Sequence, residues 1–539
     1  MLFNSYEFIF AFLPVVVAVF FALGRASRGW ALGWIIAASL FFYAWWRPLN
    51  VLIIVPSVVI NFVLARVLER LGKQGRRSAA RAVLVVGIAF NVAFLGYFKY
   101  ANFFVGAIND AFRTQMVLAR IILPLGISFI TFQKIAFLID VHAGRVESFR
   151  LQDYCLFVLF FPQLIAGPIV HYREMMPQFH GVSCRFDKEN VSVGLTLLAF
   201  GLFKKVFLAD HIASLVTPVY EHATPGNSVA FLPAWIAAVG FTLQIYFDFS
   251  GYTDMALGIA RLFGVRLPPN FNSPLRATSI IDFWQRWHMT LTRFLTAYIY
   301  NPLVLWLTRR RAARDISGFA SRNKSRGAFI ELAFIELLVF PTMLTMIVSG
   351  IWHGAGYTFI VWGVLHGVFL TVNQAWRIVG PKLWRDKSSY EPFMQPAGFI
   401  VTFACVAASM VVFRSPNLKT AAGLLQGMLG LHGIGLSGLR SAFSVGLTRV
   451  AFWIAVPACI AFLCPNILQI LSRYEPALGW KLSGPGQFPG FGRGPHDGAT
   501  AKTRLLWGPS LEWAVAVSII VAIGILYLGG QSEFLYWQF

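Results

Sequence analysis

The chain has 539 residues, of which 57% are hydrophobic, 16% aromatic and only 13% charged, and its mean hydropathy is +0.65. Because average soluble domains carry about 25% charged residues, this composition excludes an ordinary soluble protein and predicts an all-α polytopic membrane protein. The net charge of +22 does not indicate nucleic-acid binding, since the cytoplasmic loops of membrane proteins collect Lys and Arg. No long soluble segment interrupts the apolar runs, so we predict a single integral-membrane domain over residues 1–539.

Apolar runs recur along the chain, and about a dozen crossings are expected at ~20 apolar residues each. In chain order the runs are 7–24, 30–46, 50–68, 82–99, 119–139, 192–208, 229–249, 328–350, 356–376, 395–414, 449–471 and 512–529. They group into N-terminal helices at 1–118, a core at about 119–376 and C-terminal helices at 395–539. The topology of residues 140–205 stays open, because the stretch 160–168 either breaks a helix or re-enters the membrane.

Positive charge predicts the orientation in the membrane. Arg25, Arg28 and the basic loop 69–81 belong on the cytoplasmic side by the positive-inside rule, which places the N-terminus outside. Residues 209–228 contain no Lys or Arg and are expected as an outer loop. The loop 309–326 carries seven positive residues and falls inside, where it can dock an acidic carrier protein or lipid headgroups.

Two histidines, His353 and His366, lie thirteen residues apart in one of the most apolar regions. A histidine at membrane depth must be shielded from lipid by the protein, paired with another polar group, or used in the protein's function. If 328–350 runs outward and 356–376 returns, His353 lies at the turn of a buried hairpin. Desolvation disfavours the imidazolium, and a neutral imidazole can take a proton from an attacking hydroxyl. We therefore predict that His353 is a general base or a transient acyl carrier. His366 belongs to no recognisable motif, so we assign it no role.

A second candidate is the stretch from Asp282 to His288. On a helix, Trp284, Trp287 and His288 share a face by their spacing. An interfacial anchor, with Trp in the headgroup region and Arg286 facing anionic lipid, is the simpler interpretation. That interpretation leaves His288 unexplained.

Polar residues also gather near 250, where Asp248, Tyr252 and Asp254 follow one another closely. They are either a solvated helix end or the polar lining of a cavity that opens inward. The six-residue spacing of the two carboxylates does not predict a paired acid and base. Lys204 and Lys205 are expected to extend to the membrane interface.

Neither a metal site nor a disulfide framework is expected. The five cysteines contain no CxxC pair, and His211 and His222 are expected at an outer surface without a metal role. The Gly- and Pro-rich stretch 480–499 predicts a flexible cytoplasmic loop.

At several of these residues the sequence resembles the membrane-bound O-acyltransferase (MBOAT) family, most closely its alginate O-acetyltransferase branch. The matching motifs occur in the expected order along nearly the whole chain. They are Phe132-Gln133, Ile139-Asp140-Val141, Phe161–Ile169, Tyr246–Met255, Phe283–His288, Trp352–Ala355 and Phe534–Phe539. The sequence departs from the branch pattern at 296–298 and 301–303, which leaves the substrate or partner open.

The resemblance implies an MBOAT-type ring of about a dozen transmembrane helices around a catalytic tunnel. It implies that His353 is the catalytic histidine and that His288 is the second conserved polar position. It also implies acetyl transfer from a cytoplasmic donor, acetyl-CoA or an acyl-carrier thioester, with no bound cofactor. The acceptor would be an exopolysaccharide or other surface glycan outside the bacterial inner membrane, reached with a periplasmic acetyltransferase partner.

Two hypotheses follow. The first is an O-acetyltransferase with His353 and His288 as catalytic residues. Seven further residues are predicted along the substrate or donor tunnel: Gln133, Asp248, Tyr252, Asp254, Arg286, Trp287 and Trp352. The second is a transporter or flippase for a polar or lipid-linked substrate, against which stand the missing internal repeat and the few carboxylates at mid-membrane depth.

Overall fold

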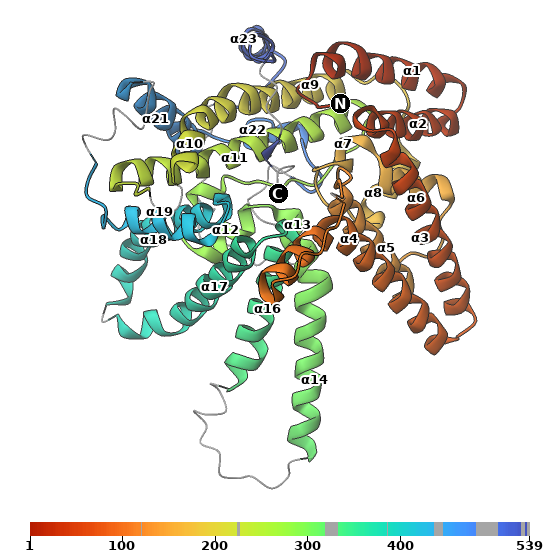
Figure 1. The fold of residues 1–539 in the computed structure, drawn as a ribbon. Helices are drawn as coiled ribbons and strands as arrows, with labels where there is room; N and C mark the ends of the chain where they lie inside the picture. The colour runs from red at the N-terminus through yellow and green to blue at the C-terminus, as the bar shows by residue number, and fades with distance from the viewer. Residues whose placement is uncertain are drawn as a thin grey trace. The chain divides into compact units, whose positions relative to one another are not determined.

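The computed structural model describes residues 1–119, 121–223, 227–317, 332–384, 386–435, 446–480, 505–529 and 534–535. Within these ranges all regular structure is helical (Figure 1), which confirms the all-α fold class. Some predicted features lie wholly or largely outside them. These are residues 318–326 of the basic loop, the loop 480–499, and the last four residues of the motif at 534–539.

Nine helices in the described part of the chain are long and apolar enough to cross a membrane. They are Glu7–Ala26, Arg28–Trp46, Leu49–Lys73, Arg77–Phe112, Lys188–His222, Phe231–Leu262, Leu332–His353, Tyr357–Leu383 and Ser388–Arg414. Two more apolar helices, Thr448–Leu463 and Leu511–Leu526, are shorter. The prediction of a multi-pass membrane protein is confirmed, whereas the expected count of about a dozen crossings is not.

The chain forms two compact units. The first comprises Met1–Leu208, Phe247–Asn270 and Pro465–Gln538, and the second mainly Ala209–Tyr246 and Phe271–Cys464. The long helix α11 (Phe231–Leu262) contributes residues to both. The predicted grouping into 1–118, 119–376 and 395–539 stays a prediction.

The first unit begins with α1 and α2, which lie side by side (Figure 1). Its helices are α1 (Leu13–Ala26), α2 (Arg28–Trp46), α3 (Leu49–Lys73), α4 (Arg77–Phe112), α5 (Ile127–His142), α6 (Leu151–Leu159), α7 (Phe161–Leu164), α8 (Tyr172–Gly181), α9 (Lys188–Leu202), α22 (Ile467–Ile470) and α23 (Leu511–Leu526). The side chain of Ser27 caps α2 by accepting from the backbone N–H of Gly29. The open stretch 160–168 contains only the four-residue α7, so the helix breaks there.

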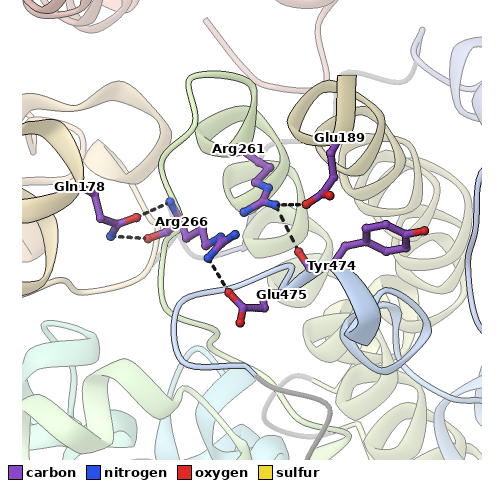
Figure 2. Close-up of polar contacts among 6 residues, drawn as sticks. All are labelled: Gln178, Glu189, Arg261, Arg266, Tyr474 and Glu475. Atoms are coloured by element: carbon purple, nitrogen blue, oxygen red, sulfur yellow. Dashed lines mark hydrogen bonds and ion pairs between the residues drawn. The ribbon is translucent and has the colours of Figure 1, made fainter. Parts of the chain in front are cut away.

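A charged clasp holds the C-terminal end of α11 in the first unit (Figure 2). Its members are Gln178, Glu189, Arg261, Arg266, Tyr474 and Glu475. Arg261 is buried and donates to a carboxylate oxygen of Glu189 at 3.2 Å, and Arg266 donates to Glu475 at 2.5 Å. The Gln178 amide bonds both the N–H and the C=O of Arg266, at 2.8 and 3.0 Å. The clasp therefore fixes the chain where it leaves α11.

The second unit contains the region around both candidate catalytic histidines. Its helices are α10 (Asp210–His222), α12 (Ile280–Arg286), α13 (Met289–Leu295), α14 (Asn301–Ser317), α16 (Phe340–His353), α17 (Tyr357–Leu383), α18 (Lys387–Arg414), α19 (Leu418–Met428) and α21 (Leu447–Leu463). Helix α10 continues the helix that begins with α9, so the segment expected as an outer loop is helical as far as His222. Helices α16 and α17 form a hairpin (Figure 1), which agrees with the predicted turn after His353.

Two glycines allow α16 and α17 to approach closely. A Cβ atom on Gly350 would lie 2.3 Å from the carbonyl oxygen of Phe359, and one on Gly363 would lie 2.4 Å from that of Met346. Both obstructing atoms are backbone, so no side-chain rotation can make room. Small residues at such crossings are typical of membrane helices, where close van der Waals packing holds neighbouring helices together.

We expect Gly363→Ala to lower the thermal stability of the purified protein, because the added methyl group forces α16 and α17 apart. Overpacking of this kind costs about 1–3 kcal/mol. Gly423→Ala in α19 is the matched control, since nothing lies within 4 Å of its Cβ position and alanine favours a helix interior. The measurement is the unfolding temperature in detergent, and equal temperatures for both variants would contradict the close crossing.

Candidate active site

His353 is the last residue of α16 and is 6% exposed. Its ring Nδ1 lies 2.6 Å from the carbonyl oxygen of Ser349, one turn earlier on the same helix. A carbonyl oxygen only accepts hydrogen bonds, so Nδ1 carries the proton and donates it. In the neutral ring the basic lone pair therefore resides on Nε2. This one contact orients the imidazole and selects the atom that can accept a proton.

Aromatic rings from three helices surround His353. Its ring centroid lies 4.9 Å from that of Trp352, 4.8 Å from that of Trp362 on α17, and 5.6 Å from that of Phe413 on α18. All three aromatic side chains are buried. The imidazole of His353 is therefore enclosed in an apolar shell.

His288 is buried between α12 and α13 and adopts a left-handed backbone conformation, with φ of 43°. A positive φ is uncommon outside glycine and often marks a functional site. The His288 ring centroid lies 6.1 Å from that of Trp352, the neighbour of His353. Burial, and then the nearby His353, lowers the pKa of His288 well below its usual value, so this ring is neutral as well.

The expected helix through Trp284, Trp287 and His288 is wrong. Helix α12 ends at Arg286, and Trp287 is extended, with its ring stacked on Phe283 at 5.5 Å. The interfacial-anchor interpretation is also wrong, because Trp284 and Trp287 are each 5% exposed and pack inside the protein. The break after Arg286 separates the three side chains that a continuous helix would have aligned.

His366, to which the sequence assigned no role, is fully buried and pins three helices together. Trp284 on α12 donates its indole N–H to Nδ1 of His366 at 3.2 Å. Because an indole N–H only donates, Nδ1 must be the unprotonated nitrogen. Nε2 then donates to Ser409 Oγ on α18 at 3.0 Å, and Ser409 donates to the Val406 carbonyl at 2.7 Å. These hydrogen bonds hold His366 neutral in one tautomer. The one sequence feature that could have indicated a packing role for His366 is its four-residue spacing from Trp362.

Arg286 and Trp352 also belong to the second unit. Arg286 forms an ion pair with Asp282 at 2.7 Å, one turn earlier on α12. Its backbone carbonyl accepts the N–H of Asn272 at 3.0 Å. Trp352 contacts both candidate catalytic histidines, as described above. The structure thus gathers His288, Trp352 and His353 into one cluster, whereas their catalytic roles stay predictions.

Two lysine–aspartate pairs lie inside the first unit. Lys205 bonds Asp248 at 2.6 Å, with the two side chains 1% and 3% exposed, and Lys204 bonds Asp254 at 2.6 Å. The second Asp248 oxygen accepts the backbone N–H of Leu535 at 3.2 Å. The lysines do not extend to the interface as expected, because a π-helical segment, Phe203–Ala209, presents them to carboxylates on α11. Such segments are often found at functional positions.

The remaining predicted tunnel residues also lie in the first unit. The Tyr252 ring stacks on Phe3 at 4.9 Å and meets the edge of Phe534 at 4.5 Å. Gln133 is 2% exposed on α5, and its Oε1 has no hydrogen-bond donor within the described ranges. The structure thus groups Gln133, Tyr252 and the two aspartates with the first unit, and the histidine cluster with the second.

Comparison with known proteins adds a similarity that runs along the whole chain. The model of the membrane-bound O-acyltransferase family matches residues 77–314. A peptidoglycan O-acetyltransferase of Helicobacter pylori is 38% identical over 481 residues, which cover 84% of each chain. Probable alginate O-acetylases of Pseudomonas aeruginosa and Azotobacter vinelandii are 32% and 33% identical over the full length of both chains.

Ser409→Ala should destabilise the protein by about 1–3 kcal/mol, because it leaves the Nε2–H of His366 buried without its acceptor. Ser415→Ala is the matched control. Ser415 directly follows the same helix as its C-cap residue and is also buried, and its hydroxyl donates to the Val411 carbonyl at 2.7 Å. Thermal unfolding of both variants measures the difference, and equal losses would refute the hydrogen-bond chain through His366.

Asp248→Asn should destabilise the protein by about 3–5 kcal/mol, since it removes the carboxylate that pairs with the buried charge of Lys205. Replacing both partners, as Lys205→Met with Asp248→Leu, should recover much of the loss. Glu69→Gln serves as control, because Glu69 pairs with Arg66 and Lys73, whose side chains are 51% and 68% exposed, and exposed pairs contribute about 0–1 kcal/mol. A double variant as unstable as Asp248→Asn would argue against the pair.

Proposed function

This chain belongs to the membrane-bound O-acyltransferase family, and we propose that it transfers acetyl groups from a cytoplasmic thioester to a polysaccharide outside the cytoplasmic membrane. Family membership confirms the resemblance drawn from the sequence motifs and the prediction of a membrane-bound O-acyltransferase. The acetyl group and the polysaccharide are supported by relatives named for O-acetylation of peptidoglycan and alginate. The same similarity leaves the transporter hypothesis with no observation in its favour.

His353 is the general base of the proposed reaction, and the observation that carries this role is its hydrogen bond to Ser349. With Nδ1–H engaged, Nε2 accepts the proton of the acceptor hydroxyl while the hydroxyl oxygen attacks the acyl carbonyl carbon. The carbon–oxygen bond forms and the carbonyl oxygen takes up negative charge. Collapse of this intermediate breaks the carbon–sulfur bond, and the departing thiolate takes the proton back from His353.

His288 belongs to the same proposed site, since its ring centroid lies 6.1 Å from that of Trp352. Its ring is neutral, so it can donate or accept a hydrogen bond without adding charge to a buried site. We assign it to holding the donor thioester, with Arg286 and Trp287 beside it. Either acetyl-CoA or an acyl-carrier protein meets this requirement, because both present the acetyl group on the same pantetheine arm.

The charge pattern supports a proposed location for the enzyme. Arg25, Arg28 and the basic loop 69–81 favour the cytoplasmic side, so the N-terminus is periplasmic in a bacterial inner membrane. A donor made in the cytoplasm and an acceptor outside then require the acyl group to cross the membrane. A periplasmic acetyltransferase partner would relay the group to the polysaccharide, or the sugar hydroxyl would accept it directly.

His353→Ala should lower acetyl transfer about 10²–10⁴-fold, the usual contribution of a general base. The measurement is transfer of labelled acetyl groups from acetyl-CoA by purified protein in lipid nanodiscs, alongside acetylation of the surface polysaccharide in cells. His288→Asn should reduce transfer less, and asparagine tolerates the left-handed backbone at this position.

His142→Ala is the control for this experiment, because His142 is an exposed histidine at the end of α5. It should retain full transfer and normal membrane insertion. Undiminished acetylation by folded, inserted His353→Ala protein would overturn the assignment. Movement of substrate across the bilayer with no acetyl transfer by the unmodified protein would favour a transporter.

A further inference from the structure

Trp362 carries a buried hydrogen-bond donor beside the candidate catalytic base. Its side chain is 1% exposed, and its indole Nε1–H has no acceptor among the residues that the structure describes. Buried tryptophans usually find an acceptor for this group, and an unmet donor is costly where water is excluded. An unmet donor at a reaction centre is suited to an acceptor that arrives with the substrate.

The ring of Trp362 lies directly against the histidine cluster. Its centroid is 4.8 Å from that of His353 and 4.7 Å from that of His366, with Phe413 at 5.4 Å. This position follows from the crossing of α16 and α17, since the crossing residue Gly363 is the next residue after Trp362. The indole is therefore held by packing on several sides and needs little reorganisation during a reaction.

Two other nearby donors already have partners. The indole N–H of Trp284 is bound by Nδ1 of His366, and the Nδ1–H of His353 is bound by the Ser349 carbonyl. The reacting hydroxyl must approach Nε2 of His353, because that is the ring nitrogen left to accept a proton. The carbonyl under attack then lies close to the same edge of the imidazole, among the rings that enclose it.

We propose that the Nε1–H of Trp362 donates a hydrogen bond to the acyl carbonyl oxygen and stabilises the negative charge that forms there. The inference rests on the function proposed above for His353. When the hydroxyl oxygen bonds the carbonyl carbon, the electron pair of the C=O bond moves to this oxygen and the proton moves to His353. When the C–S bond breaks, the C=O bond re-forms and the indole keeps its own proton throughout. A preorganised donor of this type stabilises the transition state more than the ground state.

The test compares two substitutions of Trp362 in the full-length protein in nanodiscs, with acetyl-pantetheine as donor. Trp362→Phe keeps an aromatic ring and removes the N–H, so kcat should fall about 10²–10³-fold with little change in KM. Trp362→His retains a ring N–H and should be more active than Trp362→Phe. A packing role predicts the opposite order, because phenylalanine is the better apolar replacement. The pH profile should stay as in the unmodified protein, since tryptophan does not titrate.

Trp235→Phe is the matched control. Its indole N–H also lies in the second unit but is bound by the Met428 carbonyl at 3.0 Å. This variant should keep its kcat. A kcat for Trp362→Phe within twofold of the unmodified protein, or Trp362→His less active than Trp362→Phe, would overturn the inference. Full activity of His353→Ala would instead overturn the proposed function, so the two failures are distinguishable.

A spectroscopic measurement tests the same bond without turnover. Acetyl-pantetheine labelled with ¹³C at the carbonyl is bound to inactive His353→Ala protein, and the carbonyl stretching frequency is recorded by difference infrared spectroscopy. A hydrogen bond from Trp362 should lower this frequency relative to the protein that also carries Trp362→Phe. Identical frequencies in the two proteins would overturn the inference even if both variants lose stability.

Discussion

The histidine cluster depends on the close crossing of α16 and α17. Gly350 and Gly363 bring the two backbones so near that a methyl group on either would meet a carbonyl oxygen of the other helix. This approach places His353, at the end of one helix, against Trp362 on the other. Within a bilayer, helices gain little from hiding apolar side chains from one another, so close backbone contact is an important source of their association. The proposed chemistry and the helix packing therefore rely on the same two glycines.

Several buried polar groups around this crossing are satisfied by the protein itself. Both ring nitrogens of His366 form hydrogen bonds, and the Nδ1–H of His353 donates a hydrogen bond to the Ser349 carbonyl on its own helix. In the first unit Lys205 is matched by Asp248. Such pairing is required where no water is available to replace it. The unmet indole N–H of Trp362 is the observation behind the role proposed for it.

Several features of the site were accessible from the sequence because they depend on local pattern. The apolar runs predicted helices, and the succession of the runs 328–350 and 356–376 predicted the turn at which His353 lies. Predictions that assumed one continuous helix failed at Trp287, because stacking on Phe283 and burial outweigh helical periodicity there. The lysine prediction failed for a related reason. Snorkelling assumes that water is the best partner, whereas Lys205 finds a carboxylate 43 residues away.

The sequence by itself determined that this chain is a membrane protein of helices, and its motifs predicted catalytic roles for His353 and His288. Those conclusions rest on composition, periodicity and short motifs, which are local properties. Only the tertiary structure decided which nitrogen of His353 carries the proton, that His366 is bonded between Trp284 and Ser409, and that the Trp362 ring lies beside His353. These depend on contacts between helices far apart in the chain, and hydrogen-bond direction has no counterpart in residue spacing.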